Sequence, residues 1–117
     1  MRSETMGNIQ LDVFTPATEM LRALRSKQVS SIELLQMHLD QIERYNPQIN
    51  VIVTPDFDNA RKVAAAADRT LVNDGGGALL GLPITIKDCI DVKGLLSTGG
   101  VEEWADHVSE ADSLVAA

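Results

Sequence analysis

Two short runs of β-branched residues, separated by a helical segment, limit most strongly what this chain can fold into. The runs are "INVIVT" at 49–54 and "LPITIKDCID" at 82–91, and each has the length and composition of a β-strand. Between them, small apolar residues at 60–71 recur at helical spacing, and three glycines at 75–77 end this pattern. Strands that are joined through a helix are typical of a layered α/β sheet.

Two helices are predicted before the first run. The Thr-Pro pair at 15–16 is typical of a helix start, with the threonine as N-cap, and an apolar stripe continues from it to about residue 27. Ser30 and Glu33 have the spacing of a capping box, which opens a second helix. We expect the Asn-Pro pair at 46–47 to stop this second helix.

A last helical pattern begins at about Ser109, in "SEADSLVAA", but the sequence ends soon after it. A helix so short is marginal without packing partners, and two strands alone make a poor sheet. We therefore expect residues 15–117 to be an αβαβα portion of a larger α/β fold, incomplete in this chain, behind a polar leader at 1–14.

Composition excludes several classes of partner. The formal charge is −7 and the isoelectric point is near 4.6, whereas nucleic acids and anionic membranes attract basic surfaces. No run approaches the roughly 20 apolar residues of a membrane-spanning helix. The single cysteine, Cys89, excludes an internal disulfide framework and a multi-cysteine metal site, so the expected compartment is the reducing cytoplasm. His38 has no other metal-ligand residue at suitable spacing, so no metal is expected.

Lys87 interrupts the largely apolar segment "GLPITIKDCIDVKG" at 81–94. Alternation along a strand would place it on one face with Thr85 and Cys89, without an acidic residue to pair it. Burying an unpaired ammonium is costly, so the amine meets water, finds a partner elsewhere, or loses its charge and becomes a base. A solvated lysine at a sheet edge is the simpler alternative, and the segment alone leaves both open.

Three stretches in a fixed order carry a resemblance to a known family. They are "SSIELLQMHLDQIERYNPQINVIVT" at 30–54, "AAAADR" at 64–69 and "LLGLPITIKDCIDVKGLLSTGG" at 79–100, followed by an aspartate before "SLVAA". In this order they resemble the N-terminal part of the amidase signature family, over about residues 15–117. The resemblance implies an α/β/α sandwich with a mixed sheet, and amide hydrolysis or transfer by two serines and a lysine, without a cofactor.

Carried over by position, the resemblance puts the family's catalytic lysine at Lys87. In the family this lysine is held neutral and takes a proton through the middle serine of the triad, which lies in a cis peptide bond, and so activates the nucleophilic serine. The serine-rich segment that supplies both serines has no match in this chain. Ser97, Ser109 and Ser113 are the local serines, and Ser97 is interpreted as a turn-capping residue.

The neighbours of Lys87 allow other chemistry. Cys89, about 7 Å away along a strand, could be a thiolate activated by the ammonium, but we favour a structural, space-filling role. Asp88 and Asp91 could be paired carboxylates for acid–base catalysis, but they would lie on opposite strand faces. Asp88 is therefore expected to accept structural hydrogen bonds, and Asp91 to cap a loop.

Two functions follow from these observations. The first is a piece of an amide hydrolase that carries only the catalytic lysine, serves a small amide substrate in the complete enzyme and is inactive alone. The sequence does not separate a hydrolase from an amidotransferase. The second is a non-catalytic association module that self-associates or docks on a partner, the missing C-terminal part included, through uncovered apolar faces.

Overall fold

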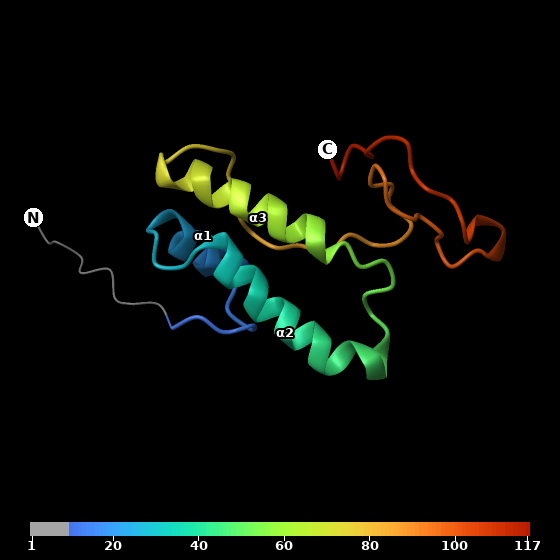
Figure 1. Cartoon of the computed structure of the whole chain (residues 1–117), viewed down its shortest axis with the longest axis horizontal. Coiled ribbons are helices and arrows are strands. Elements are labelled where there is room, and N and C mark those ends of the chain that lie inside the picture. The colour runs from blue at the N-terminus through green and yellow to red at the C-terminus, as the bar shows by residue number, and fades with distance from the viewer. Residues whose placement is uncertain (1–9) are drawn as a thin grey trace, which may run out of the picture. The chain divides into compact units, whose positions relative to one another are not determined.

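Three α-helices form the regular part of the structure. The computed structural model describes residues 10–117. Its elements are α1 (Ala17–Arg25), α2 (Ser31–Ile49), α3 (Phe57–Val72) and a 3₁₀-helix, η1 (Glu102–Trp104) (Figure 1). The three predicted helices before and between the β-branched runs are therefore confirmed, each within a few residues of its expected bounds. The predicted leader at 1–14 lies mostly outside the described residues.

The chain divides into two compact units. Unit 1 contains the residues up to 44 and those from 58 to 83, and unit 2 contains 45–57 and 84–117. Unit 1 therefore holds α1 and most of α2 and α3, whereas unit 2 holds the segment around Lys87 and everything after it.

Unit 1 is held together by an apolar core to which all three helices contribute. Met20 and Leu24 of α1, Leu34 of α2 and Leu71 of α3 form its buried cluster. Leu24 and Leu34 are the largest fully buried side chains. Partly buried residues pack against the cluster from the flanking loops and α1: Leu11, Leu21, Val29, Leu80 and Leu82. Burial of this kind is the main favourable term in folding.

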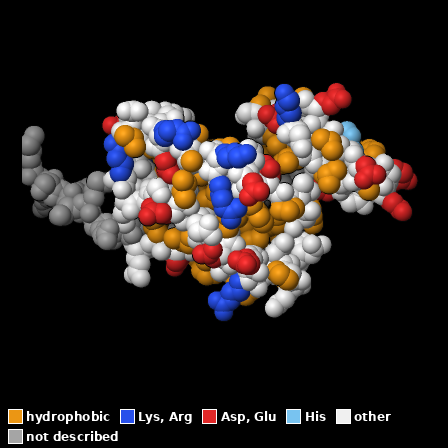
Figure 2. All heavy atoms as spheres, viewed as in Figure 1, with side chains coloured by type: hydrophobic (Ala, Val, Ile, Leu, Met, Phe, Trp, Pro, Cys, Tyr) orange, Lys and Arg blue, Asp and Glu red, His pale blue; other side chains and the backbone are white. Residues whose placement is uncertain are grey.

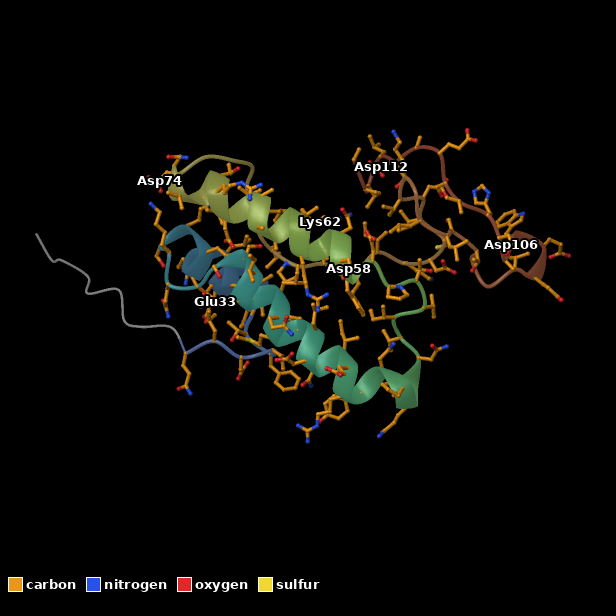
Figure 3. The ribbon with its side chains drawn as sticks, in the orientation of Figure 1. Glu33, Asp58, Lys62, Asp74, Asp106 and Asp112 are labelled. Atoms are coloured by element: carbon orange, nitrogen blue, oxygen red, sulfur yellow. The ribbon has the colours of Figure 1, made fainter. Side chains whose placement is uncertain are left out.

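Side-chain capping was predicted for the first turns of α1 and α2, and only the prediction for α2 is correct. The capping box of α2 is confirmed: the Ser30 N–H donates to Glu33 Oε2 at 2.9 Å, and the Glu33 N–H donates to Ser30 Oγ at 3.1 Å; Figure 3 labels Glu33. Thr15 as the N-cap of α1 is wrong, because Pro16 takes that position. The Thr15 hydroxyl oxygen instead accepts from the Asp12 N–H at 2.9 Å.

The end of α2 corrects another expectation. The helix runs through the Asn-Pro pair at 46–47 to Ile49, and it ends where Asn50 takes a φ of 49°. A proline in the last turn removes one hydrogen bond but does not force the chain out of the helix at once. The Asn46 side chain then bonds both backbone groups of Ile52, at 3.0 and 2.8 Å.

The predicted strands are not formed among residues 10–117. The runs at 51–53 and 82–87 are assigned to no strand or helix, and the only β-pairing in the described part is one antiparallel bridge, Leu96 to Val108. An extended segment becomes a strand only through hydrogen bonds to a neighbour. Within the described residues, the backbone groups of 84–86 make no such bond. The mixed sheet is therefore not confirmed.

Unit 2 is organised by polar contacts around a loop at 94–109. Besides the Leu96–Val108 bridge, the Gly94 N–H donates to the Ser109 carbonyl at 2.8 Å and the Ser109 N–H donates back to the Leu95 carbonyl at 3.0 Å. The helix predicted from Ser109 is wrong, since only a turn forms at 113–116. Ser109 faces inward instead and is 4% exposed.

Candidate functional site

Lys87 lies at the end of the irregular segment 82–87, where the chain enters a tight turn. The Ile90 N–H donates to the Lys87 carbonyl at 2.9 Å and closes this turn. The Lys87 side chain is exposed, so of the alternatives that the segment left open, the structure shows the amine in contact with water. A residue on a strand face is buried only when another layer packs over that face, and no sheet forms among the described residues. Among residues 10–117, no hydrogen bond or ion pair engages the amine.

Asp88, the next residue, ties the Lys87 turn to the loop at 97–100. Its carboxylate accepts from the Thr98 N–H at 3.3 Å and from the Thr98 hydroxyl, and its carbonyl accepts from the Ser97 hydroxyl at 3.2 Å. The Thr98 hydroxyl, followed by the Thr98 N–H, holds the pKa of Asp88 below its ordinary value. Asp88 as a structural hydrogen-bond acceptor is thus confirmed.

Asp91 has a similar role at the other end of the turn. Its carboxylate accepts from the Ser109 hydroxyl at 2.7 Å, and its carbonyl accepts from the Ser113 N–H at 2.9 Å. The hydroxyl bond from Ser109, followed by the nearby Ser97 hydroxyl, lowers the pKa of Asp91, and the nearby His107 contributes in the same direction. Asp91 therefore joins the turn to the last residues of the chain, as its predicted capping role requires.

The serines of unit 2 are used for structure. Ser97 and Ser109 are buried, at 6% and 4% exposure, and their hydroxyls are committed to Asp88 and Asp91. The Ser113 hydroxyl oxygen accepts from the Ala116 N–H at 3.3 Å. In the described part of the chain, none of them hydrogen-bonds to Lys87. The structure therefore brings no serine to the lysine, and Ser97 has the turn-stabilising role predicted for it.

Cys89 does not fill space in a core. Its thiol is free and exposed, and it lines a cavity of about 370 Å³ together with residues of the 94–109 loop: Asp91, Ser97, Gly99, Trp104 and His107. The interpretation of Cys89 as a space-filling residue is wrong, because the turn at 87–90 replaces the strand on which that interpretation depended. The sequence carries no local signal that predicts Trp104 and His107 near Cys89.

Two long-range polar contacts were also missed. Asp68 of α3 accepts from the Ser31 and Ile32 N–H groups at 2.6 and 3.2 Å and so caps the start of α2. Arg25 donates to the carbonyls of Gly75 and Gly77 and holds the loop after α3. Neither has a local sequence signal, because the partners are 36 or more positions apart.

Metal-ligand clusters and membrane-spanning helices can be searched for in the described part of the chain. Within residues 10–117, no group of three or more histidine, cysteine or acidic side chains is placed to hold a metal ion. His38 Nδ1 lies 2.8 Å from the Leu34 carbonyl, one turn back in α2. In that same part of the chain, no helix is both long and apolar enough to cross a membrane.

Similarity to known proteins covers most of the chain. The Amidase family profile matches residues 33–117. A glutamyl-tRNA(Gln) amidotransferase subunit from Azoarcus sp. (strain BH72) is 40% identical over 98 residues, which are 84% of this chain and 20% of that protein. Fatty-acid amide hydrolase 2-A of Danio rerio is 34% identical over 105 residues, covering 83% of this chain and 20% of that protein.

A solved structure agrees with these sequence matches. It is a bacterial aryl acylamidase of the amidase signature family, with a TM-score of 0.77 and 32% identity, covering 84% of this chain and 21% of the other. This chain thus spans about a fifth of the length of the relatives that it matches. The family profile covers well over half of the chain and includes the entire Lys87 turn. The chain belongs to the amidase signature family.

Proposed function

We propose that Lys87 is the base of a Ser–cis-Ser–Lys triad that hydrolyses an amide, and that both serines come from another part of the complete enzyme. One observation carries the proposal: the stretch that matches the amidase family contains Lys87, and its amine is engaged by no hydrogen bond or ion pair among residues 10–117. An exposed lysine without a partner among the described residues is available to a serine from another part of the enzyme.

The proposed chemistry requires Lys87 to be neutral, whereas contact with water in the isolated chain favours its charged form. Water stabilises the charged form of an exposed lysine, whereas covering the side chain favours the neutral form. In the complete enzyme, the amine would take a proton from the middle serine, which in turn takes one from the nucleophilic serine. That serine would attack the amide carbonyl, the amine product would leave with a proton, and water would release the acyl group. Residues 1–117 alone are therefore expected to be inactive.

The parts of the complete enzyme that would cover Lys87 would also supply the missing strands of the sheet. The segments at 51–53 and 82–87 have the β-branched composition of strands, and the backbone groups of 84–86 have no backbone partner in the described part of the chain. We infer that both segments become strands of a mixed sheet, within an α/β/α sandwich, when the remaining strands of the enzyme pair with them.

A segment exchange tests the proposal for Lys87. Residues 33–117 would replace the matching part of the bacterial aryl acylamidase, and hydrolysis of p-nitroacetanilide, a chromogenic aryl amide, would be followed. Lys87→Met is expected to lower kcat/KM by at least about 100-fold, the usual contribution of a positioned acid or base. Lys93→Met, at an exposed lysine in the same unit, should leave the rate within about twofold. Equal losses in both variants would remove Lys87 from catalysis.

The isolated chain gives a complementary result. With the same amide it should show no turnover above buffer, because no serine of the described residues hydrogen-bonds to Lys87. Turnover that depends on Lys87 in the isolated chain would contradict this part of the proposal.

A second function, as an association module, is supported by exposed apolar side chains. Ile84 is 68% exposed, Val51 66% and Val53 54%, and hydrophobic side chains reach the surface among charged ones (Figure 2). Large exposed apolar patches drive association. Light scattering after gel filtration should then show a dimer or larger species, and Val53→Ser with Ile84→Ser should shift it toward monomer. A monomer at all concentrations would exclude self-association.

The remaining expectations concern partners and compartment. The amidotransferase relatives are named as one subunit of that enzyme, which supports further subunits as partners of the complete protein. The proposed amide hydrolysis requires a small amide as substrate. The single free cysteine fits the proposed location in the reducing cytoplasm.

A further inference from the structure

Asp88, the residue that follows Lys87, is bound by one loop through both its side chain and its backbone. Its carboxylate accepts from the Thr98 hydroxyl and from the Thr98 N–H, the latter at 3.3 Å. Its carbonyl accepts from the Ser97 hydroxyl at 3.2 Å and from the Gly99 N–H at 3.3 Å. We call these four hydrogen bonds the Asp88 clamp. The donors are three consecutive residues, so the clamp ties Asp88 to a single turn of the chain.

The turn that forms the clamp also orients the Thr98 hydroxyl. Gly99 and Gly100 have φ values of 57° and 74°, in the left-handed region that glycine adopts at little steric cost. The Gly100 N–H donates to the Thr98 hydroxyl oxygen at 3.2 Å. The hydroxyl has one proton, and it donates this proton to the Asp88 carboxylate. Hydrogen bonds to an ionised acceptor are stronger than neutral ones, so we expect this bond to contribute most to the clamp.

Lys87 depends on the clamp because the chain before it is not held. Within residues 10–117, the backbone groups of 84–86 make no backbone hydrogen bond. After it, the Lys87 carbonyl accepts from the Ile90 N–H at 2.9 Å, and the next carbonyl, that of Asp88, belongs to the clamp. These two consecutive peptide units fix the direction in which the Lys87 side chain leaves the backbone. The clamp therefore acts on the amine through the backbone and not by direct contact.

The clamp also engages the carboxylate that follows Lys87 in the sequence. The bonds from the Thr98 hydroxyl and N–H hold the pKa of Asp88 below its ordinary value, so this residue is anionic at neutral pH. An anion paired with an amine favours the charged form of the amine, whereas the proposed mechanism uses the neutral form. Among the described residues no ion pair joins Asp88 to Lys87, and the carboxylate binds Thr98 instead.

We propose that Asp88 and Thr98 are positioning residues for Lys87: Thr98 holds the Asp88 carboxylate, and this contact fixes the Lys87 turn in the geometry that proton transfer from a serine requires. The catalytic part of this inference rests on the proposed function. A base works only within hydrogen-bond reach of the proton that it takes, and a displacement of about 1 Å can lower the rate by about 100-fold. Neither positioning residue transfers the proton itself.

The isolated chain tests the contact without any amide. Hydrogen exchange of the Ile90 N–H, followed by NMR, reports whether the Lys87 turn is closed, because this N–H donates to the Lys87 carbonyl. Thr98→Val keeps the shape of the side chain but removes the hydroxyl, and it should speed the exchange at least about tenfold. Thr98→Ser keeps the hydroxyl and should stay within about threefold of the unchanged chain. The Leu34 N–H, in unit 1, should exchange at the same rate in all three proteins.

The segment-exchanged aryl acylamidase tests the consequence for catalysis. With p-nitroacetanilide, and per mole of folded enzyme, Thr98→Val should lower kcat at least about tenfold while KM stays within about twofold, because the clamp orients the base and not the substrate. Thr98→Ser should restore most of kcat. Thr70→Val is the matched control: it removes a hydroxyl that bonds the Ala66 carbonyl in α3 of unit 1, and it should leave kcat within about twofold.

A double variant shows whether the two positioning residues act through one contact. Asp88→Ala and Thr98→Val both remove the bond between hydroxyl and carboxylate. Their combination should therefore lower kcat no further than Asp88→Ala alone, within about twofold. Losses that multiply would mean that Asp88 acts independently of Thr98, and they would overturn the clamp as the means of positioning.

Failure of the positioning role and failure of the proposed function give different results. An unchanged Ile90 exchange rate in Thr98→Val would overturn the positioning role and leave the proposed function in place. The same holds for an unchanged kcat in Thr98→Val when Lys87→Met loses its activity. An unchanged rate in Lys87→Met would overturn the proposed function, and the positioning role in catalysis with it.

Discussion

Unit 1 and unit 2 are stabilised by different kinds of contact. Among the described residues, every buried hydrophobic side chain belongs to unit 1, whereas the only buried residues of unit 2 are Ser97 and Ser109. Unit 1 closes its own apolar core from three helices. Unit 2 is held by short polar contacts from Asp88, Asp91 and the 94–109 loop, and it leaves apolar side chains exposed.

The two units differ in what their backbone requires. A helix satisfies its own backbone and needs only one covered face, so the described residues up to 44 and those from 58 to 83 close the core of unit 1. A strand needs neighbours for its backbone and cover for both faces. Unit 2 contains Lys87, and among residues 10–117 no strand pairs with the segment that precedes it. Substitutions that perturb one unit at a time separate the two kinds of stabilisation.

The largest effect is expected in the core of unit 1. Leu34→Ala removes a side chain that is 0% exposed and should lower the free energy of unfolding by about 2–5 kcal/mol. Ile32→Ala, two residues earlier on α2 and 45% exposed, is the matched control and should cost clearly less. Urea unfolding followed by circular dichroism measures both. Similar losses would show that the core does not dominate the stability of unit 1.

A glycine beside that core gives the next effect. Gly81 has a φ of +85°, and an added Cβ would lie 3.2 Å from Leu71 Cδ1 and 3.3 Å from Ser31 Cβ. Gly81→Ala should therefore cost about 1–3 kcal/mol through backbone strain and crowding. At Gly77 an added Cβ meets nothing within 4 Å, so Gly77→Ala is the control. Thermal unfolding that is equally affected by both changes would exclude a special role for Gly81.

The cap between α3 and α2 should have a smaller effect. Asp68→Ala removes the acceptor for the Ser31 and Ile32 N–H groups and should cost about 0.5–2 kcal/mol. Asp68→Asn keeps an acceptor oxygen and should recover part of the loss. Asp58→Ala, at a residue that is 98% exposed on the same helix, controls for the lost charge. If both variants lose the same free energy of unfolding, the lost charge alone explains the effect of Asp68→Ala.

Local patterns were sufficient for the helices but insufficient for the site. The apolar spacing and the capping box of Ser30 and Glu33 predict α2 correctly because the interactions span three or four residues. The β-branched composition at 82–87 was equally clear, but a strand forms only with a paired neighbour, and none is assigned to these residues within 10–117. The strand pattern therefore did not predict the exposure of Lys87 or the cavity around Cys89. Likewise Asp68, 36 residues from Ile32, gives no sign of its role before the chain folds.

The smallest effect is expected in unit 2, at the carboxylate of Asp88. Its pKa lies below the ordinary value because Thr98 donates to it, so the folded state binds its proton less tightly than the unfolded chain does. The stabilisation is present above the unfolded pKa and is lost as pH falls through the folded pKa. The amide resonance of Thr98, followed by NMR, should shift with a midpoint below that of an ordinary aspartate. Asp88→Asn should abolish this titration and leave the core resonance of Leu34 unchanged. A midpoint at or above the ordinary value would mean that Thr98 does not hold the carboxylate, and the Lys87 turn would then be joined to its neighbouring loop only through the Asp88 carbonyl, which accepts from the Ser97 hydroxyl and the Gly99 N–H.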